Sequence, residues 1–492
     1  MITGDRMAAV DANAAALGVP QVQLMESSGN AIARRVGELL EREDTVVIVA
    51  GRGNNGGDAF VAARFLDGDR SDRDGDEGTS SYDVRTTLLG SPDRITTEIT
   101  RQNWDALVAG DAATETVTDS LSFELPEADL VVDAMVGTGV SGDLREPIAT
   151  AAHAMNAADA PVLSVDVPSG LDAETGELAA NAVRPDHVVT FHDLKPGLDE
   201  LDAAVTVANI GIPTAAERFV GPGDVDLARP PDRSGRAYVI GGGPYTGAPA
   251  LAAQAALRSG MELSFVAAPD AVAGEIQGYA EDLIVQPYEG DRLTPDHVED
   301  LLETAIAYEN VIVLGPGLGS ADESLDAARS FLESYDDRVV VDAEALSVVP
   351  DLDTDATLVC TPNRRELARM GGPETDDLAT AADEIESFAA ELGHVVLAKG
   401  VDDVVSDGER TRIVRTGVPG MAVGGTGDLL AGITAGLLED AEPFEAACAA
   451  AYVNGRAGEV LADRWGPGDG LGITASDLLT EIPGVLWGDG HA

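Results

Sequence analysis

Short runs of β-branched and other apolar residues alternate with alanine-rich stretches along the 492 residues of the chain. This alternation predicts an α/β protein with largely parallel sheets. Apolar positions between residues 7 and 24 predict a helical N-terminus before the first strand. The predicted strands of the first half are 45–50, 82–90, 128–137, 160–170 and 186–192, and those of the second half are 236–243, 262–269, 310–319, 338–346, 356–363 and 394–400.

The segment 221–236, GPGDVDLARPPDRSGR, interrupts this alternation because it is rich in Pro, Gly and Asp and has no periodicity. We therefore expect two domains, 1–222 and 236–492, joined by a linker at 223–235. A second polar stretch at 67–81 predicts a solvated loop, to which we assign no function. The two halves share a structural class but no motifs, which indicates a fusion of unlike domains.

The charge is strongly acidic, with 31 basic and 87 acidic residues and a formal net charge of −56. Such a composition resembles that of proteins from salt-loving archaea, and it disfavours nucleic acids and anionic membranes as partners. No stretch approaches the roughly 20 apolar residues of a membrane span. The N-terminus carries acids where a signal peptide needs a cationic start, so we expect a cytoplasmic protein. We also expect its partners to be small-molecule substrates and the protein to form a homo-oligomer. The two cysteines predict buried apolar positions.

In the run TVVIVAGRGNNGGDAF (45–60), a glycine-rich turn directly follows the first predicted strand. Gly51, Gly53 and Gly56 satisfy GxGxxG, a weak indication of a dinucleotide site when it stands alone. An ordinary NAD fold also needs a carboxylate about 20 residues later, where this chain has only the polar loop. Asp58 would put a fixed anion where a pyrophosphate lies against free amides. A tight turn with an Asp helix cap stays open as an alternative.

Polar residues also follow two further strands of the first half. Asp133 ends one of them, and Asp166 and Ser169 follow another. Because the carboxyl ends of parallel strands share one edge of a sheet, we expect these residues to meet Asn55 at one pocket. Asn55, Asp133 and Ser169 offer only oxygen ligands, which suit a hard cation rather than zinc. A single carboxylate favours K⁺ over Mg²⁺.

The motifs GRGNNGGDAF, VVDAMVGTGVSGDLREP, SVDVPSGLDAETG and VTFHDLKPGL resemble those of the NAD(P)H-hydrate epimerases over about residues 1–215. The resemblance implies a Rossmann-like three-layer sandwich that exchanges the R and S forms of hydrated NADH or NADPH. It also implies K⁺ ligands at Asn55, Asp133 and Ser169 and an acid–base role for Asp166. The implied substrate contacts are Asn54, Asn55, Gly56, Gly57, Asp58, Gly137, Thr138, Gly139, Val140, Ser141, Gly142, Asp143 and Asp166.

The strongest motif of the second half is GVPGMAVGGTGDLLAGITAGLL at 417–438. A glycine-rich loop, residues 420–427, leads into a predicted helix that starts near Asp428. Free amides at such a helix start form an anion hole for a transferring phosphoryl group. Asp428 stands at its mouth, where it can take a proton from an attacking hydroxyl. The GK[ST] of a Walker loop is absent.

This segment resembles the ribokinase-like kinases and, among them, the NAD(P)H-hydrate dehydratases, with LGPGLG, VVDAEAL, CTPNRRELARM and LAKGVDD in support over about residues 232–486. The resemblance implies a ribokinase-like α/β domain that uses ADP and Mg²⁺. Asp428 would let the hydroxyl of the S form attack ADP, so that AMP, phosphate and NAD(P)H result. The implied substrate contacts are Ala248, Gly317, Asn363 and Asp428, and the implied nucleotide contacts are Lys399, Gly400, Val401, Asp402, Asp403 and Gly427.

One position departs from this family, which usually has a histidine where Asn363 stands. Asparagine forms hydrogen bonds but does not titrate near neutrality, so the substrate contact there is in doubt. The chain has only two lysines, Lys195 and Lys399, and both lie inside the motifs, so we expect both near the pockets. Two other functions stay open: a small-molecule kinase with an accessory N-terminal domain, and a non-catalytic binding role for that domain.

Overall fold

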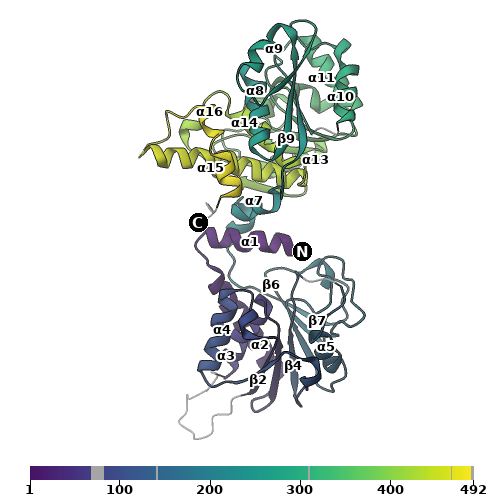
Figure 1. Cartoon of the computed structure of the whole chain (residues 1–492), viewed down its shortest axis with the longest axis vertical. Coiled ribbons are helices and arrows are strands. Elements are labelled where there is room, and N and C mark those ends of the chain that lie inside the picture. The colour runs from purple at the N-terminus through teal and green to yellow at the C-terminus, as the bar shows by residue number, and fades with distance from the viewer. Residues whose placement is uncertain (68–81, 140–141, 309–310, 467, 489–492) are drawn as a thin grey trace. The chain divides into compact units, whose positions relative to one another are not determined.

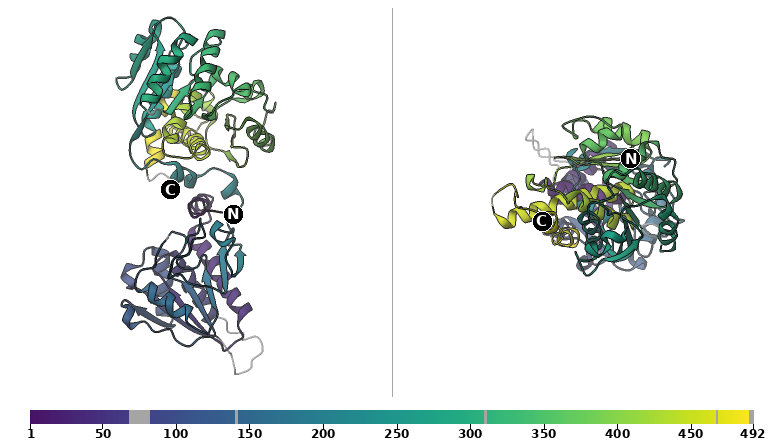
Figure 2. Two further views of the ribbon diagram at one scale, coloured as in Figure 1. Left: turned by 90° about the vertical axis from the view of Figure 1, so that its right-hand side faces the viewer. Right: turned by 90° about the horizontal axis from the view of Figure 1, so that it is seen from above.

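The computed structural model describes residues 1–67, 82–139, 142–308, 311–466 and 468–488. The chain divides into two compact units, Met1–Pro213 and Thr214–Ala492. Each unit has a mainly parallel sheet with helices on both sides, as the views in Figures 1 and 2 show. The expected α/β class and its two-part organisation are confirmed. The loop predicted at 67–81 lies outside the described residues, except for Asp67.

The first unit is built on a parallel sheet with strand order β3-β2-β1-β4-β5-β6-β7. The order reverses between β1 and β4, and a crevice opens at the carboxyl ends of the strands at such a point. The strands are β1 Thr45–Ala50, β2 Asp83–Leu89, β3 Ala113–Val117, β4 Leu130–Ala134, β5 Val162–Val165, β6 His187–Phe191 and β7 Ala204–Ala208.

Two helical layers cover this sheet. Helices α2, α3 and α4 pack on one face, while α5 lies on the other against Val47, Val49 and Val131 (Figure 1). These strands alternate buried side chains between the two layers because successive residues of a strand point to opposite faces. The helices are α1 Gly4–Ala16, α2 Gln21–Leu39, α3 Asn54–Asp67, α4 Glu98–Ala109 and α5 Ile148–Asn156.

The second unit has a sheet with strand order β10-β9-β8-β11-β12-β13-β14-β15-β16. Neighbouring strands run parallel from β10 to β14, and β15 and β16 add an antiparallel hairpin. The order reverses between β8 and β11, which again marks a crevice. The strands are β8 Ser234–Ile240, β9 Met261–Pro269, β10 Ile284–Tyr288, β11 Val311–Leu314, β12 Arg338–Val341, β13 Thr357–Cys360, β14 Val395–Ala398, β15 Asp403–Ser406 and β16 Thr411–Val414.

Two separate cores flank this second sheet. Helices α8, α14 and α15 bury one face, and α10 and α11 bury the other. Helix α14 approaches α8 closely, since a Cβ at Gly432 would lie 2.1 Å from the carbonyl oxygen of Ala252. The helices are α6 Ala215–Arg218, α7 Pro222–Ala228, α8 Gly247–Arg258, α9 Asp270–Gln277, α10 Val298–Ala307, α11 Asp322–Ser334, α12 Arg364–Arg369, α13 Ala382–Leu392, α14 Thr426–Leu438, α15 Pro443–Trp465, α16 Ala475–Leu478 and α17 Ile482–Trp487.

The expected linker at 223–235 is not an open connection. Helix α7 occupies its first part and packs on α15, and β8 already begins at Ser234. Asp224 is fully buried, where its carboxylate accepts a hydrogen bond from the Gly221 amide (2.8 Å) and lies 3.8 Å from Arg412 Nε. The composition of the segment concealed this, because Pro and Asp in a first helical turn look like loop residues.

No helix among the described residues is long and apolar enough to cross a membrane. Cys360 and Cys448 are both buried, as expected from the sequence.

Candidate active sites

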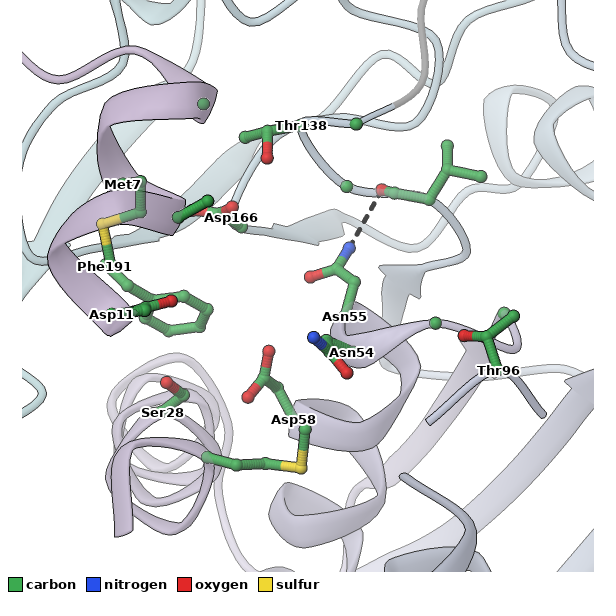
Figure 3. A pocket seen from close by; sticks show the side chains of 18 of the residues that line it. Met7, Asp11, Ser28, Asn54, Asn55, Asp58, Thr96, Thr138, Asp166 and Phe191 are labelled. Carbon is green, nitrogen blue, oxygen red and sulfur yellow. Dashed lines mark hydrogen bonds between the residues drawn. The ribbon is translucent and has the colours of Figure 1, made fainter. Parts of the chain in front are cut away.

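The first unit carries a cavity of about 540 Å³ at the carboxyl ends of β1, β4, β5 and β6. Helices α1, α2 and α3 and the loops after these strands line it. Figure 3 shows the carboxyl groups of Asp11, Asp58 and Asp166 around one space, with Asn54 and Asn55 at the start of α3. The polar residues that follow separate strands in the sequence therefore meet at one edge of the sheet.

The NNGGD segment forms the first turn of α3. Asn54, Asn55 and Asp58 line the cavity, whereas Gly56 and Gly57 are buried in helix packing and do not. A Cβ at Gly56 would lie 2.2 Å from the carbonyl oxygen of Gly51, so this position requires glycine. The glycines thus set the close approach of strand and helix, and the polar side chains face the pocket.

Asn55 and Ser169 belong to a buried polar network. The Asn55 Nδ2 donates hydrogen bonds to the carbonyl oxygens of Val136 (2.9 Å, Figure 3) and Val165 (3.0 Å). Its Oδ1 is buried and has no hydrogen-bond partner among the described residues. The Ser169 hydroxyl donates to Asp133 Oδ1 (2.6 Å) and accepts from the Val136 amide (3.1 Å). A buried acceptor without a donor is costly, and a cation would satisfy it.

Asp133 is fully buried, and both of its oxygens already accept hydrogen bonds. The donors are the hydroxyl and amide of Ser169, the hydroxyl of Ser164 and the amide of Met135. Burial raises the pKa of this carboxyl against these hydrogen bonds, which lower it. The free ligand atom of the three-residue set is thus the oxygen of Asn55, and direct ligation by Asp133 requires that one donor be displaced.

Asp166 forms an ion pair with Lys195. The Lys195 Nζ lies 2.8 Å from Asp166 Oδ1 and also donates to the carbonyl oxygen of Phe191 (2.8 Å). Thr190 also donates a hydrogen bond to the Asp166 carboxylate (3.1 Å). The Asp166 backbone has φ of +62°, an uncommon value for a non-glycine residue that often marks a functional site. The expectation that Lys195 lies near the pocket is met, but its pairing with Asp166 was not predicted.

Two further carboxyl groups face this pair. Burial, with Asp166 and Asp11 nearby, raises the pKa of Asp58 well above its ordinary value. Burial also raises the pKa of Asp11 to about 6. The raised pKa of Asp58 makes its protonated form more accessible than the fixed anion that the sequence suggested. Asp11, on α1, was missed because no role was assigned from the sequence to the residues of the N-terminal helical segment.

The GTG segment contributes to the same cavity. Gly137, Thr138 and Gly139 line it, while Asp143 lines a neighbouring cavity with Gly139. Gly142 is exposed and lines neither. Val140 and Ser141 lie outside the described residues, so the expectation for them stays a prediction.

In the second unit, the glycine-rich loop ends where α14 begins. Gly425, at φ of +100°, precedes the first turn, which contains Asp428. A Cβ at Gly420 would lie 1.8 Å from the carbonyl oxygen of Gly470, so this loop packs tightly on the chain after α15. The free amides of the α14 N-terminus and the Asp428 side chain therefore occur together, as the motif predicted.

Lys399 lies next to the first turn of α14. Its Nζ is 2.7 Å from Asp342 Oδ1, and a Cβ at Gly427 would lie 3.1 Å from it. Thr361 donates a second hydrogen bond to the same Asp342 oxygen (2.8 Å). Asp342, within the VVDAEAL segment, ends β12 and was not predicted as a site residue. Its place directly after a buried strand is the signal that could have identified it.

Two carboxyl groups around Lys399 have strongly shifted pKa values. Burial, reinforced by Asp342, raises the pKa of Asp428 to about 7. Burial also raises the pKa of Asp403 to about 7, although the Gly400 amide donates a hydrogen bond to it (2.8 Å). A pKa near neutrality is what a general base needs.

The other predicted residues of this unit are less uniform. Gly317, at φ of +79°, follows β11 and packs against Tyr245, and Ala248 lies in the first turn of α8. Both therefore lie at the reversal point of the sheet. Val401 is 98% exposed, and Asp402 pairs with Arg415 at 3.6 Å.

Asn363 is the N-cap of α12. Its Oδ1 accepts hydrogen bonds from the amides of Arg365 (2.9 Å) and Glu366 (3.1 Å), and Glu366 accepts one from the Asn363 amide (2.8 Å). Its strand-like bridge to Lys399 keeps it beside the candidate site. The side-chain oxygen is therefore committed to the helix, and the amide nitrogen is left for a ligand.

Among the residues that the structure describes, no group of three or more His, Cys, Asp or Glu is arranged to hold a metal ion.

Comparison with known proteins covers both units. Residues 237–483 match a family model described as NAD(P)H-hydrate dehydratase, and residues 21–197 match one described as YjeF-related protein N-terminus. A bifunctional NAD(P)H-hydrate repair enzyme of Methanothermobacter thermautotrophicus is 40% identical over 98% of this chain and 94% of its own. A bifunctional NAD(P)H-hydrate repair enzyme of Pyrobaculum aerophilum is also 40% identical, over 99% of this chain and 98% of its own. A Bacillus subtilis ADP/ATP-dependent NAD(P)H-hydrate dehydratase structure covers 55% of this chain and 97% of its own, with 24% identity and a TM-score of 0.47.

Proposed function

Because the chain belongs to the family of bifunctional NAD(P)H-hydrate repair enzymes, we propose that it exchanges the R and S forms of hydrated NAD(P)H and dehydrates the S form with ADP. The observation that carries this proposal is that each unit has a carboxylate at the carboxyl edge of its own sheet, to which we assign an acid–base role. In the first unit this is Asp166, paired with Lys195, and in the second it is Asp428, at the start of α14.

In the first unit, Asp166 acts as an acid–base group on the hydrate. The hydroxyl sits on C6 of the reduced ring, beside the ring nitrogen, whose electron pair can expel it. Proton transfer by a positioned carboxylate accelerates such a step. Lys195 forms an ion pair with Asp166, and Asn54 and Thr138 line the space for the nicotinamide nucleotide.

In the second unit, Asp428 removes the proton of the C6 hydroxyl, which then attacks the β-phosphoryl group of ADP. The α14 amides lie where charge gathers on that group. Phosphate is a far better leaving group than hydroxide, so it departs with help from the ring nitrogen, and loss of a proton from the neighbouring ring carbon then restores NAD(P)H. Lys399 and Gly427 contact the nucleotide. Ala248, Gly317 and the amide nitrogen of Asn363 contact the hydrate.

Two cations complete this proposal. Asn55, Ser169 and Asp133 would hold K⁺, and the unpaired buried oxygen of Asn55 supports this assignment. There it would hold the loop after β4 in place. Mg²⁺ enters with the ADP phosphates and supplies charge neutralisation during transfer.

The test uses the full chain with separately prepared R and S forms of hydrated NADH and either ADP or ATP. The S form with ADP should regain reduced-nicotinamide absorbance at once and release one phosphate per NADH. The R form should follow at a slower rate that still exceeds its uncatalysed exchange. No absorbance change with either form would contradict the proposal.

The same experiment separates the kinase alternative. A small-molecule kinase would accumulate a phosphorylated product and release no free phosphate. Detection of such a product by mass spectrometry, without NADH, would favour that function over the proposed one.

A further inference from the structure

We propose that Asp11, on α1, is the second acid–base residue of epimerisation and works together with Asp166. This inference rests on the proposed epimerase function and goes beyond the residues that the family motifs supply. It arises from one feature of the cavity: three carboxyl groups and a single lysine share it.

The chemistry of epimerisation needs two proton-transfer groups. When the C6–O bond breaks, the ring nitrogen supplies the electron pair, and the departing hydroxyl takes a proton from an acid and leaves as water. Water then adds to the opposite face of the ring and gives a proton to a base. The hydrate is regenerated, and the total number of protons on the enzyme is unchanged. One carboxylate on one side cannot perform both transfers without reorientation.

Asp11 is positioned for the second transfer. It lines the same cavity as Asp166 but comes from α1, whereas Asp166 follows β5. Figure 3 shows the Asp11, Asp58 and Asp166 carboxyl groups approaching the cavity from different elements. The Oδ1 of Asp11 is buried and has no hydrogen-bond partner among the described residues. A buried acceptor at a cavity wall, without a protein donor, is available to a ligand.

Helix α1 is firmly attached to the segment that carries Lys195. The Ile2 amide donates a hydrogen bond to the carbonyl oxygen of Leu194 (2.8 Å), and Thr3 caps the helix by accepting from the Arg6 amide (3.2 Å). Gly4 packs against Thr138 of the GTG segment. These contacts fix α1, and with it Asp11, relative to the segment that carries Lys195 and to the GTG segment.

The charges around Asp11 favour shared protons. The charged residues that line the cavity with it are Asp58 from α3, Asp166 after β5, Lys195 after β6 and Arg52 after β1, and α2 contributes none. Lys195 is committed to Asp166 by their ion pair. Burial raises the pKa of Asp11 to about 6; the charge of Lys195 lowers this pKa, and the charge of Asp166 raises it. Asp11 can therefore gain and lose a proton near working pH. Burial also raises the pKa of Asp58 well above its ordinary value, and in its protonated form Asp58 can donate a hydrogen bond.

The test compares Asp11→Asn with Asp5→Asn, a matched loss of one carboxylate from an exposed position of the same helix. With the R form and ADP, Asp11→Asn should lower the enzymatic rate of exchange by about 100-fold or more. Asp5→Asn should leave it unchanged. Dehydration of the S form by the second unit, measured in the same preparations, should be equal in all of them.

A pH profile separates a chemical role from a structural one. Wild-type kcat/KM for exchange should change near pH 6, Asp5→Asn should keep that limb, and Asp11→Asn should lose it. Asp11→Glu should restore part of the rate with a displaced limb, and it carries the test if Asp11→Asn does not fold. An exchange rate in Asp11→Asn within about threefold of wild type, or an unchanged limb in Asp11→Glu, would overturn the inference. Absence of exchange in the wild type would instead overturn the proposed function.

Discussion

The ammonium group of Lys195 lies 2.8 Å from the carboxylate of Asp166, although the two residues follow different strands of the first sheet. The lysine is fully buried, and the Asp166 backbone has φ of +62°. The pair thus combines a buried cation with an uncommon backbone conformation. Both features cost folding free energy, so the surrounding structure must stabilise them. The ion pair distinguishes Asp166 from Asp11 and Asp58, whose pKa values are raised by burial.

Removal of this cation should impair epimerisation. In Lys195→Met, Asp166 keeps its place but loses the partner that favours its ionised form, so we expect exchange to slow by about 100-fold. S-form dehydration in the same protein should not change. Arg34→Met, which removes an exposed cation from α2, is the control and should match wild type. Exchange at the wild-type rate in Lys195→Met would show that Asp166 needs no cation.

Asp428→Asn should abolish dehydration while R and S forms continue to exchange. The variant keeps the shape of the side chain but cannot accept the hydroxyl proton, and we expect a loss of about 1,000-fold. Because burial raises the pKa of Asp428 to about 7, wild-type kcat/KM for dehydration should fall as the pH drops through 7, where the base becomes protonated. Stopped-flow measurement of NADH absorbance checks both. Substantial ADP-driven recovery of NADH in the variant would refute the assignment.

Exchange, but not the S-form reaction, should depend on K⁺ through Asn55. We expect the rate to rise with K⁺ and saturate when choline replaces K⁺ at constant ionic strength. Constant ionic strength matters, because a chain of net charge −56 also responds to general screening. Asn55→Ala should lose the saturable response, since it removes the one unpaired buried oxygen of the network. An equal response in both proteins would place the ion elsewhere.

Asp403→Asn should stabilise the protein at alkaline pH. Burial raises the pKa of Asp403 from 3.8 to about 7 in the folded state. Between these values the folded chain binds more protons than the unfolded one, so the free energy of unfolding falls as the pH rises. The variant lacks this loss and keeps an acceptor for the Gly400 amide. We expect it to be about 1–3 kcal/mol more stable than wild type at pH 8, with a smaller difference at pH 5.

Urea unfolding at a series of pH values measures this difference. Asp353→Asn, at an exposed position, is the control and should follow wild type at every pH. A constant offset between Asp403→Asn and wild type would show that Asp403 is ionised throughout.

The central strands of both sheets could be read from the sequence, but several edge strands could not. β1 and β4 are continuous apolar runs because both of their faces are buried. The strands β3, β7 and β10 lie at sheet edges with mostly exposed or half-buried side chains. Their polar residues conceal the strand pattern, and only pairing with a neighbour makes them strands.

The alternation of apolar runs with helical stretches determined the fold class of this protein, and the strand-end motifs determined most of its candidate site residues. The reason is local: glycine at a tight turn, and Asn or Asp at a strand end, have the same consequence wherever the rest of the chain lies. Tertiary structure alone decided which groups share a pocket. It paired Lys195 with Asp166 and Lys399 with Asp342, it brought Asp11 to the cavity, and it committed the Asn363 oxygen to a helix cap. Burial and charge at a site are sums over residues far apart in the chain, so no single motif contains them.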